Sequence, residues 1–164
     1  MEPTKTPPAR ILIAEDFDDN RELLRLILES AGYRVSEARD GRELVEKART
    51  ETFDLVLIDI SMPHLDGWGA ISELRADAAT RNVPCVAVTA FAGEQDRRRA
   101  LAAGFDAYVA KPFRSKELLD AVARLLDGAR DGDGTRRDEH AGGRGGGQLN
   151  AQDDKRGGGD GGVR

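Results

Sequence analysis

Between residues 10 and 126 the chain alternates five short runs typical of β-strands with five longer stretches that carry apolar residues at helical spacing. The strand-like runs are Arg10–Ala14, Tyr33–Ala38, Asp54–Asp59, Pro84–Thr89 and Asp106–Ala110. The helical stretches are Asn20–Ala31, Asp40–Glu51, a segment after Gly67 that ends near Ala78, Glu94–Ala103 and Ser115–Leu126. This alternation predicts an α/β fold in which a parallel sheet carries helices on both faces.

Local signals indicate where the folded part begins and ends. The first helix is expected to start after Asp19, because Asp19 and Glu22 form a capping-box pattern. The last helix is expected to end at Leu126. From Gly128 onward the chain holds 13 of its 19 glycines and no aromatic residue, so it cannot bury enough apolar surface to become ordered. The sequence therefore predicts a flexible N-terminus over 1–8, one folded domain over 9–127, and a glycine-rich disordered tail over 128–164.

Composition excludes several classes of protein. No uninterrupted apolar run is longer than four residues, which is too short to span a membrane, and the first ten residues contain no apolar stretch like that of a secretory signal. The single cysteine, Cys85, leaves no disulfide framework and no cysteine-rich metal site. The whole net charge of −5 lies before Gly128, which argues against a broad nucleic-acid surface. A cytoplasmic protein is expected.

Charged and hydroxyl side chains stand at the carboxyl ends of the predicted strands. Glu15 and Asp16 follow the first strand, and Asp59 ends the third. Thr89 ends the fourth strand and Lys111 follows the fifth. Ligand sites of open parallel sheets lie at this edge, so these side chains should converge there. Carboxylates so close would repel one another by roughly 4 kcal/mol per pair in a medium of intermediate dielectric, and oxygen ligands favour a hard cation such as Mg²⁺.

Asp59 occupies the centre of this predicted cluster. A carboxylate there could act as a nucleophile toward a phosphoryl group, while Thr89 and Lys111 hold the incoming oxygens. In-line phosphoryl transfer asks a protein mainly for positioning and for electrostatic stabilisation. The residue types at the strand ends supply both, so the sequence predicts a site for Mg²⁺ and a phosphoryl group.

From about Arg10 to Asp127 the chain resembles the receiver domain of the two-component response-regulator family. The matching motifs are Ala14-Glu15-Asp16-Phe17, Leu57-Ile58-Asp59-Ile60-Ser61-Met62-Pro63, Asp66-Gly67, Val86-Ala87-Val88-Thr89-Ala90 and Lys111-Pro112-Phe113. The resemblance implies a flavodoxin-like (βα)5 fold, a three-layer sandwich whose five-stranded parallel sheet has the strand order 2-1-3-4-5.

The resemblance also implies a role for the residues that handle the phosphoryl group. Asp59 would accept it from a phosphohistidine of a histidine kinase, and Thr89 and Lys111 would contact its oxygens. Tyr108 would be a switch residue that turns inward when Thr89 moves toward the phosphate. The Lys111–Pro112 peptide bond is expected to be cis. Such a protein is a phosphoacceptor switch, not an enzyme: it catalyses only its own phosphorylation and dephosphorylation.

A metal-binding set follows from the same resemblance. Asp16 and Asp59 would bind Mg²⁺ together with the backbone carbonyl of Ser61. Glu15 would act mostly through a water molecule.

No second folded domain is expected, so the resemblance predicts a stand-alone receiver that acts on other proteins. Its partners would be the kinase and a downstream protein, bound through the face formed by the fourth helix (94–103), the fifth strand (106–110) and the last helix (115–126). No direct DNA binding and no membrane association are expected, and the protein would be a monomer or a phosphorylation-dependent dimer. An alternative is a relay intermediate that passes the phosphoryl group to a histidine phosphotransfer protein.

Three other functions compete with the switch. A haloacid-dehalogenase-type phosphatase also uses an Asp nucleophile after a strand, but it needs a second Asp where this chain has Ser61. A flavodoxin-type cofactor carrier needs a phosphate-binding loop after the first strand, and Glu15 and Asp16 would repel a phosphate there. A phosphate-independent receiver-like binding module usually lacks a site residue, whereas all of them are present here.

Overall fold

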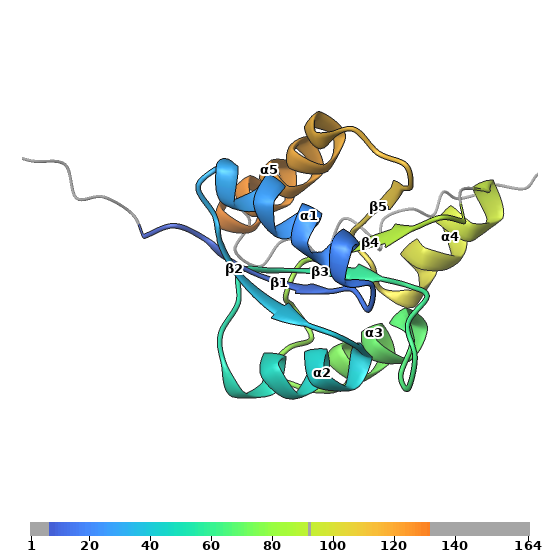
Figure 1. Ribbon diagram of the computed structural model, residues 1–164. Helices are drawn as coiled ribbons and strands as arrows, with labels where there is room; N and C mark the ends of the chain where they lie inside the picture. Colours follow the sequence, from blue (N-terminus) through green and yellow to red (C-terminus); the bar gives the residue numbers. More distant parts are fainter. Residues whose placement is uncertain (1–6, 92, 132–164) are drawn as a thin grey trace, which may run out of the picture. The chain divides into compact units, whose positions relative to one another are not determined.

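The computed structural model describes residues 7–91 and 93–131, and these contain five strands and five helices in alternation (Figure 1). The strands are β1 (Arg10–Ala14), β2 (Arg34–Ala38), β3 (Leu55–Asp59), β4 (Cys85–Thr89) and β5 (Ala107–Ala110). The helices are α1 (Asp18–Ser30), α2 (Gly41–Thr50), α3 (Gly67–Ala76), α4 (Glu94–Ala103) and α5 (Ser115–Asp131).

The five strands form one parallel sheet with the order β2-β1-β3-β4-β5. In its register Ala14 lies beside Ile58, and Asp59 lies beside Val88, so the carboxyl ends of neighbouring strands meet at one edge. Every residue of β3 and β4 is buried, as expected for central strands covered on both faces. The predicted flavodoxin-like three-layer sandwich is confirmed.

Each face of the sheet has its own apolar core, because successive side chains of a strand point to opposite faces. Ile11 and Ile13 belong to the core shared with α1 and α5, whereas Leu12 and Ala14 belong to the core shared with α2, α3 and α4. Figure 1 shows α1 and α5 on one side of the sheet and α2 and α3 on the other. The buried apolar helix residues are Leu24, Leu28, Leu118, Ala121, Val122 and Leu126 on the first face and Leu44, Val45, Ala48, Ala70, Ile71, Leu74 and Ala100 on the second. The two layers of helices hold the strand ends at fixed positions and leave the carboxyl edge open for a site.

The start of α1 differs from the prediction. The helix begins at Asp18, and the residue before it is Phe17, whose side chain makes no capping hydrogen bond. The carboxylate of Asp18 accepts a hydrogen bond from the guanidinium of Arg21, one turn further along. The predicted capping box of Asp19 and Glu22 is therefore wrong, because an ion pair within the first turn takes the place of a side-chain cap.

The last helix also differs from the prediction. It continues past Leu126 to Asp131, so residues 128–131, expected in the tail, belong to α5. The remainder of the predicted tail, 132–164, and residues 1–6 of the predicted flexible N-terminus lie outside the described residues. None of the described helices is both long and apolar enough to cross a membrane.

Gly41, the first residue of α2, lies against the loop that follows β3. Its N–H donates to the carbonyl oxygen of Leu65 at 3.1 Å, and a Cβ at this position would lie 2.2 Å from that oxygen. We expect Gly41→Ala to lower the free energy of unfolding by about 1–3 kcal/mol, because the backbone of the loop must move. Gly128→Ala, in open space on α5, is the matched control and should raise it by up to about 1 kcal/mol. Urea unfolding measures both, and equal stability of Gly41→Ala and wild type would contradict the packing argument.

Candidate phosphoryl and metal site

The sheet brings the residues that were predicted to form a site to one edge. Glu15 and Asp16 directly follow β1, and Asp59 is the last residue of β3. Thr89 is the last residue of β4, and Lys111 directly follows β5. Because β1, β3, β4 and β5 are consecutive neighbours in a parallel sheet, their carboxyl ends lie side by side.

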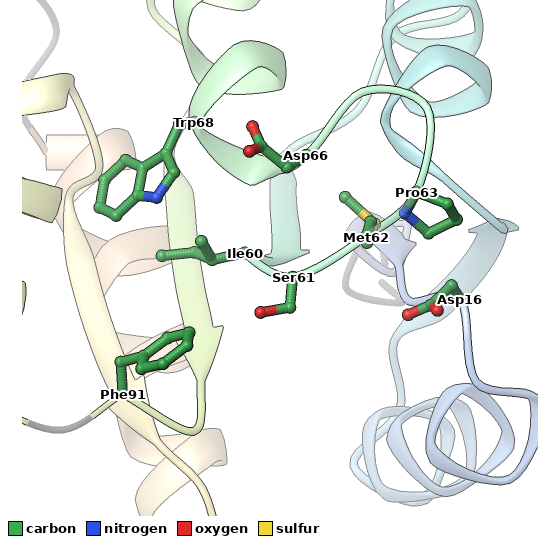
Figure 2. A pocket seen from close by; sticks show the side chains of 8 residues that line it. All are labelled: Asp16, Ile60, Ser61, Met62, Pro63, Asp66, Trp68 and Phe91. Carbon is green, nitrogen blue, oxygen red and sulfur yellow. The ribbon is translucent and has the colours of Figure 1, made fainter.

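A cleft of about 580 Å³ opens at this edge beside the loop that follows β3 (Figure 2). It is lined by Asp16, Ile60, Ser61, Met62, Pro63, Asp66, Trp68 and Phe91. Figure 2 shows Trp68 and Phe91 along one side of the cleft and Asp16 on the other. The cleft thus combines carboxylate and aromatic side chains, and Asp16 of the predicted site lies in its lining.

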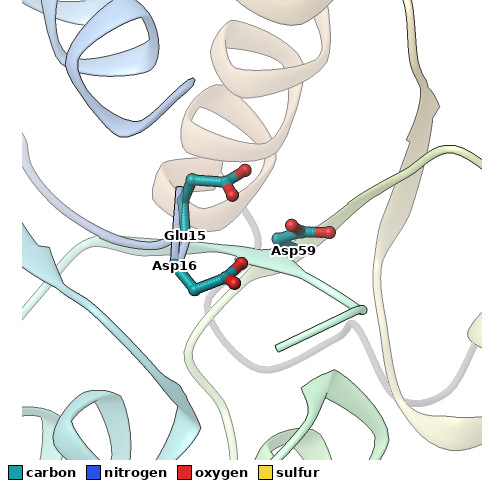
Figure 3. Close-up of side chains that lie close together, drawn as sticks. All are labelled: Glu15, Asp16 and Asp59. Carbon is teal, nitrogen blue, oxygen red and sulfur yellow. The ribbon is translucent and has the colours of Figure 1, made fainter. Parts of the chain in front are cut away.

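Three carboxylates converge at this edge. Glu15, Asp16 and Asp59 each offer an oxygen within 4.8 Å of the other two, and Figure 3 shows the side chains from the end of β1 pointing toward Asp59. Glu15 is 1% exposed and Asp59 6%, whereas Asp16 is exposed. Glu15 and Asp59 are thus largely withdrawn from water. Their carboxylates repel each other more strongly there than they would in water, because the surrounding dielectric is lower.

Lys111 supplies the positive charge that these carboxylates face. Its Nζ donates to Oε1 of Glu15 at 3.1 Å and to Oδ2 of Asp59 at 3.4 Å. Burial and the charge of Asp59 raise the pKa of Glu15, although the Phe17 amide and Lys111 oppose this. Burial alone would lower the pKa of Lys111, but the charges of Asp59 and Glu15 outweigh burial and raise it. One ammonium for three carboxylates leaves the site with excess negative charge.

The donor set fits a hard divalent cation. All three side chains offer carboxylate oxygens, and Mg²⁺ is usually held by one or two carboxylates together with waters and phosphate oxygens. The backbone N–H of Ser61 donates to Oδ1 of Asp59 at 3.3 Å, which places the Ser61 backbone next to this cluster. Bound Mg²⁺ would cancel the excess charge that Lys111 leaves uncompensated.

Thr89 is buried at the end of β4, next to the chain that carries Lys111. Its carbonyl oxygen accepts from the Lys111 backbone N–H at 2.7 Å, and its hydroxyl oxygen accepts from the Phe91 N–H at 3.1 Å. The hydroxyl hydrogen of Thr89 can still be donated to a ligand. The Lys111–Pro112 peptide bond is cis, as predicted.

Tyr108 lies on β5, where it pairs with Ala87 of β4, and β4 separates it from Asp59 on β3. Its ring packs against the core on the side of α4, and its hydroxyl is buried without a hydrogen-bond partner among the described residues. Burial and the charge of Asp96 on α4 raise the pKa of the phenol. The half-buried ring therefore connects the β4–β5 end of the sheet with α4.

Two features of the site's surroundings were not predicted from the sequence. Trp68 makes an edge contact with Phe105, with ring centroids 6.2 Å apart, and the guanidinium of Arg99 lies 4.0 Å from the Trp68 ring centroid. Arg21 is only 9% exposed and contacts the backbone of Glu15. A signal for Arg21 was present, because it lies one turn before the buried Leu24, on the stripe that faces the sheet.

A family model and curated relatives both indicate the same protein family for this chain. The family model of the response regulator receiver domain matches residues 11–123. The polar-differentiation response regulator DivK of Brucella anthropi is 34% identical over 122 residues, which are 74% of this chain and 99% of DivK. The gliding motility regulatory protein of Myxococcus xanthus is 35% identical over 126 residues, but these cover 16% of that protein.

Solved structures agree. The receiver domain of sensor histidine kinase PA1611 from Pseudomonas aeruginosa, with a magnesium ion coordinated in its active-site cleft, is 38% identical with a TM-score of 0.69. The match covers 73% of this chain and 98% of that domain. Chemotaxis protein CheY4 of Vibrio cholerae is 28% identical with a TM-score of 0.68, over 72% of this chain and 98% of CheY4.

Proposed function

The chain belongs to the response regulator receiver domain family, whose members are signalling switches of two-component systems, and we propose that its Asp59 accepts a phosphoryl group from a histidine kinase in a Mg²⁺-dependent reaction. One observation carries the proposal: the carboxylate of Asp59 lies within reach of both Lys111 and the two acids that follow β1. A nucleophile, a cation for the transferred oxygens and a set of metal ligands thus occupy one edge of the sheet.

The transfer itself needs little covalent chemistry from the protein. An oxygen of Asp59 forms the new bond to phosphorus, the bond from phosphorus to the imidazole nitrogen of the donor breaks, and its electron pair stays on the imidazole. Lys111 and the Thr89 hydroxyl hold two of the phosphoryl oxygens by hydrogen bonds. Asp16, Asp59 and the Ser61 carbonyl would hold Mg²⁺, with Glu15 acting mostly through a water molecule, and the bound ion would supply charge neutralisation.

The output is proposed to be a change in the face formed by α4, β5 and α5, which binds a downstream protein. The hydroxyl oxygen of Thr89 accepts a hydrogen bond from the N–H of Phe91, which lies in the segment between β4 and α4. When Thr89 turns toward a phosphoryl group that hydrogen bond is lost, and the segment and Tyr108 can change position. A shift from mostly inactive to mostly active needs about 5.5 kcal/mol of differential stabilisation, and a newly paired dianion is a source for it.

The test is phosphorylation by acetyl phosphate, a small donor that needs no kinase. With Mg²⁺ present, wild type should gain one phosphoryl group in an intact-mass measurement, and Asp59→Asn should gain none. Asp120→Asn, at an exposed carboxylate paired with Lys116 on α5, is the matched control and should react like wild type. The same reaction in EDTA should give no product. A wild-type protein that gains no phosphoryl group with Mg²⁺ would refute the proposal.

A further inference from the structure

A buried arginine on α1 contacts the chain just where it leaves β1. Arg21 donates from Nη1 to the carbonyl oxygen of Glu15 at 2.9 Å, a bond in the protein interior. The rest of the guanidinium donates to Asp18 at 2.5 Å and to Oε1 of Glu37 at 3.1 Å. Asp18 lies on the same helix and Glu37 on β2, so one side chain ties α1 to β2 and to the residue that follows β1.

The carbonyl that Arg21 holds belongs to the peptide unit between Glu15 and Asp16. A peptide unit is planar and rigid, so fixing its oxygen also fixes the direction in which the Cα atoms of both residues lie. In the preceding peptide unit, between Ala14 and Glu15, the N–H of Glu15 donates to the carbonyl oxygen of Ala38 at 3.2 Å. The backbone that presents the two carboxylates is thus held from β2 on one side and from α1 on the other.

We infer that Arg21 is a positioning residue for the proposed Mg²⁺ site: by holding the Glu15–Asp16 peptide, it aims both carboxylates toward Asp59. The inference rests on the proposed function. Asp18 and Glu37 neutralise the guanidinium, so Arg21 acts on the metal through geometry and not through its charge. Side chains that orient metal ligands typically change metal affinity when they are removed.

Arg25, one turn further along α1, provides a matched control. It pairs with Glu29 at 3.1 Å and with Glu37 at 3.5 Å, so it shares the acidic partner of Arg21. Its described hydrogen bond goes to Glu29, not to the Glu15 carbonyl. Removing Arg25 therefore weakens the charge network around Glu37 and leaves the hold on the Glu15–Asp16 peptide intact.

The experiment measures binding of MgCl₂ alone by calorimetry, with thermal unfolding in EDTA as the readout of a merely structural role. Arg21→Met should bind Mg²⁺ on the order of tenfold more weakly than wild type, whereas Arg25→Met should stay within about twofold. Equal affinity of wild type and a folded Arg21→Met would overturn the inference, and so would an equal loss in Arg25→Met. If wild type itself binds no Mg²⁺, the proposed function has failed instead.

Arg21→Lys covers the case in which Arg21→Met does not fold. Lysine keeps the charge and the aliphatic stem, but its single nitrogen cannot reproduce the fork that reaches three acceptors. We expect Arg21→Lys to bind Mg²⁺ about threefold or more weakly than wild type, because Asp18 and Glu37 compete with the Glu15 carbonyl for that nitrogen. Wild-type affinity in this variant would overturn the inference.

Discussion

Lys111→Met should lower the rate at which acetyl phosphate phosphorylates Asp59 by on the order of 100-fold, while Mg²⁺ binding stays as tight as in wild type or becomes tighter. The Lys111 ammonium lies 3.4 Å from Oδ2 of Asp59, where it can also meet the oxygens of an incoming phosphoryl group. Fixed donors aimed at charge that develops in a transition state typically contribute this much to a rate. Methionine keeps the apolar stem and removes only the charge and the donors.

The two parts of this result separate catalysis from metal binding. Without Lys111 the three carboxylates lose their cationic partner, so their attraction for Mg²⁺ does not fall. A variant that binds Mg²⁺ but reacts slowly therefore has lost stabilisation of the transferred group itself. Lys116→Met, at an exposed lysine paired with Asp120 on α5, is the control and should react at the wild-type rate. A Lys111→Met rate within about threefold of wild type would mean that the ammonium is not part of the reaction.

The convergence of the site residues was predictable because it depends on topology and not on side-chain detail. A buried parallel strand reads as an uninterrupted apolar run, and β1, β3 and β4 have such runs. A charged or hydroxyl residue at the end of each run must then lie at the same edge of the sheet. For this reason Glu15, Asp59 and Thr89 could be placed together from the sequence alone, and the sheet register brings them there.

Other features depend on tertiary contacts that no local pattern encodes. The pattern of Asp19 and Glu22 suggested a cap, but Arg21 pairs with Asp18, and α1 begins there without a side-chain cap. Arg99 lies on α4 and Trp68 on α3, and β4 separates these helices in the sequence. The pattern of either helix alone therefore could not predict which of their side chains would meet. The end of α5 was missed because Gly128, a poor helix former, lies inside the helix.

Asp59→Asn should make the metal-free protein more stable, although it abolishes the proposed reaction. In EDTA near neutral pH we expect the free energy of unfolding to rise by about 1 kcal/mol, because the repulsion that is removed, roughly 4 kcal/mol per close pair in a medium of intermediate dielectric, is partly offset by the lost attraction between Asp59 and Lys111. The change removes one of three clustered carboxylates, while Lys111 keeps its shorter contact with Glu15, 3.1 Å against 3.4 Å. Saturating Mg²⁺ should make wild type the more stable of the two proteins, because wild type binds the ion more tightly and gains more stability from it.

The pH dependence of this difference follows from Glu15. Its pKa in the folded protein is raised above the ordinary value of 4.5 by burial, then by the charge of Asp59, so folding favours its protonated form. The stability that this group contributes is fully present below pH 4.5 and is lost as the pH rises through the raised folded pKa. Asp59→Asn removes one cause of the raised pKa of Glu15, so this variant should lose less stability than wild type as the pH rises from 4.5 through that pKa. Urea unfolding in EDTA at about pH 7.5 and about pH 5 should therefore show the advantage of Asp59→Asn shrinking at the lower pH. An advantage that grows on acidification, or a variant less stable than wild type near neutral pH, would mean that carboxylate repulsion does not limit the stability of the metal-free site.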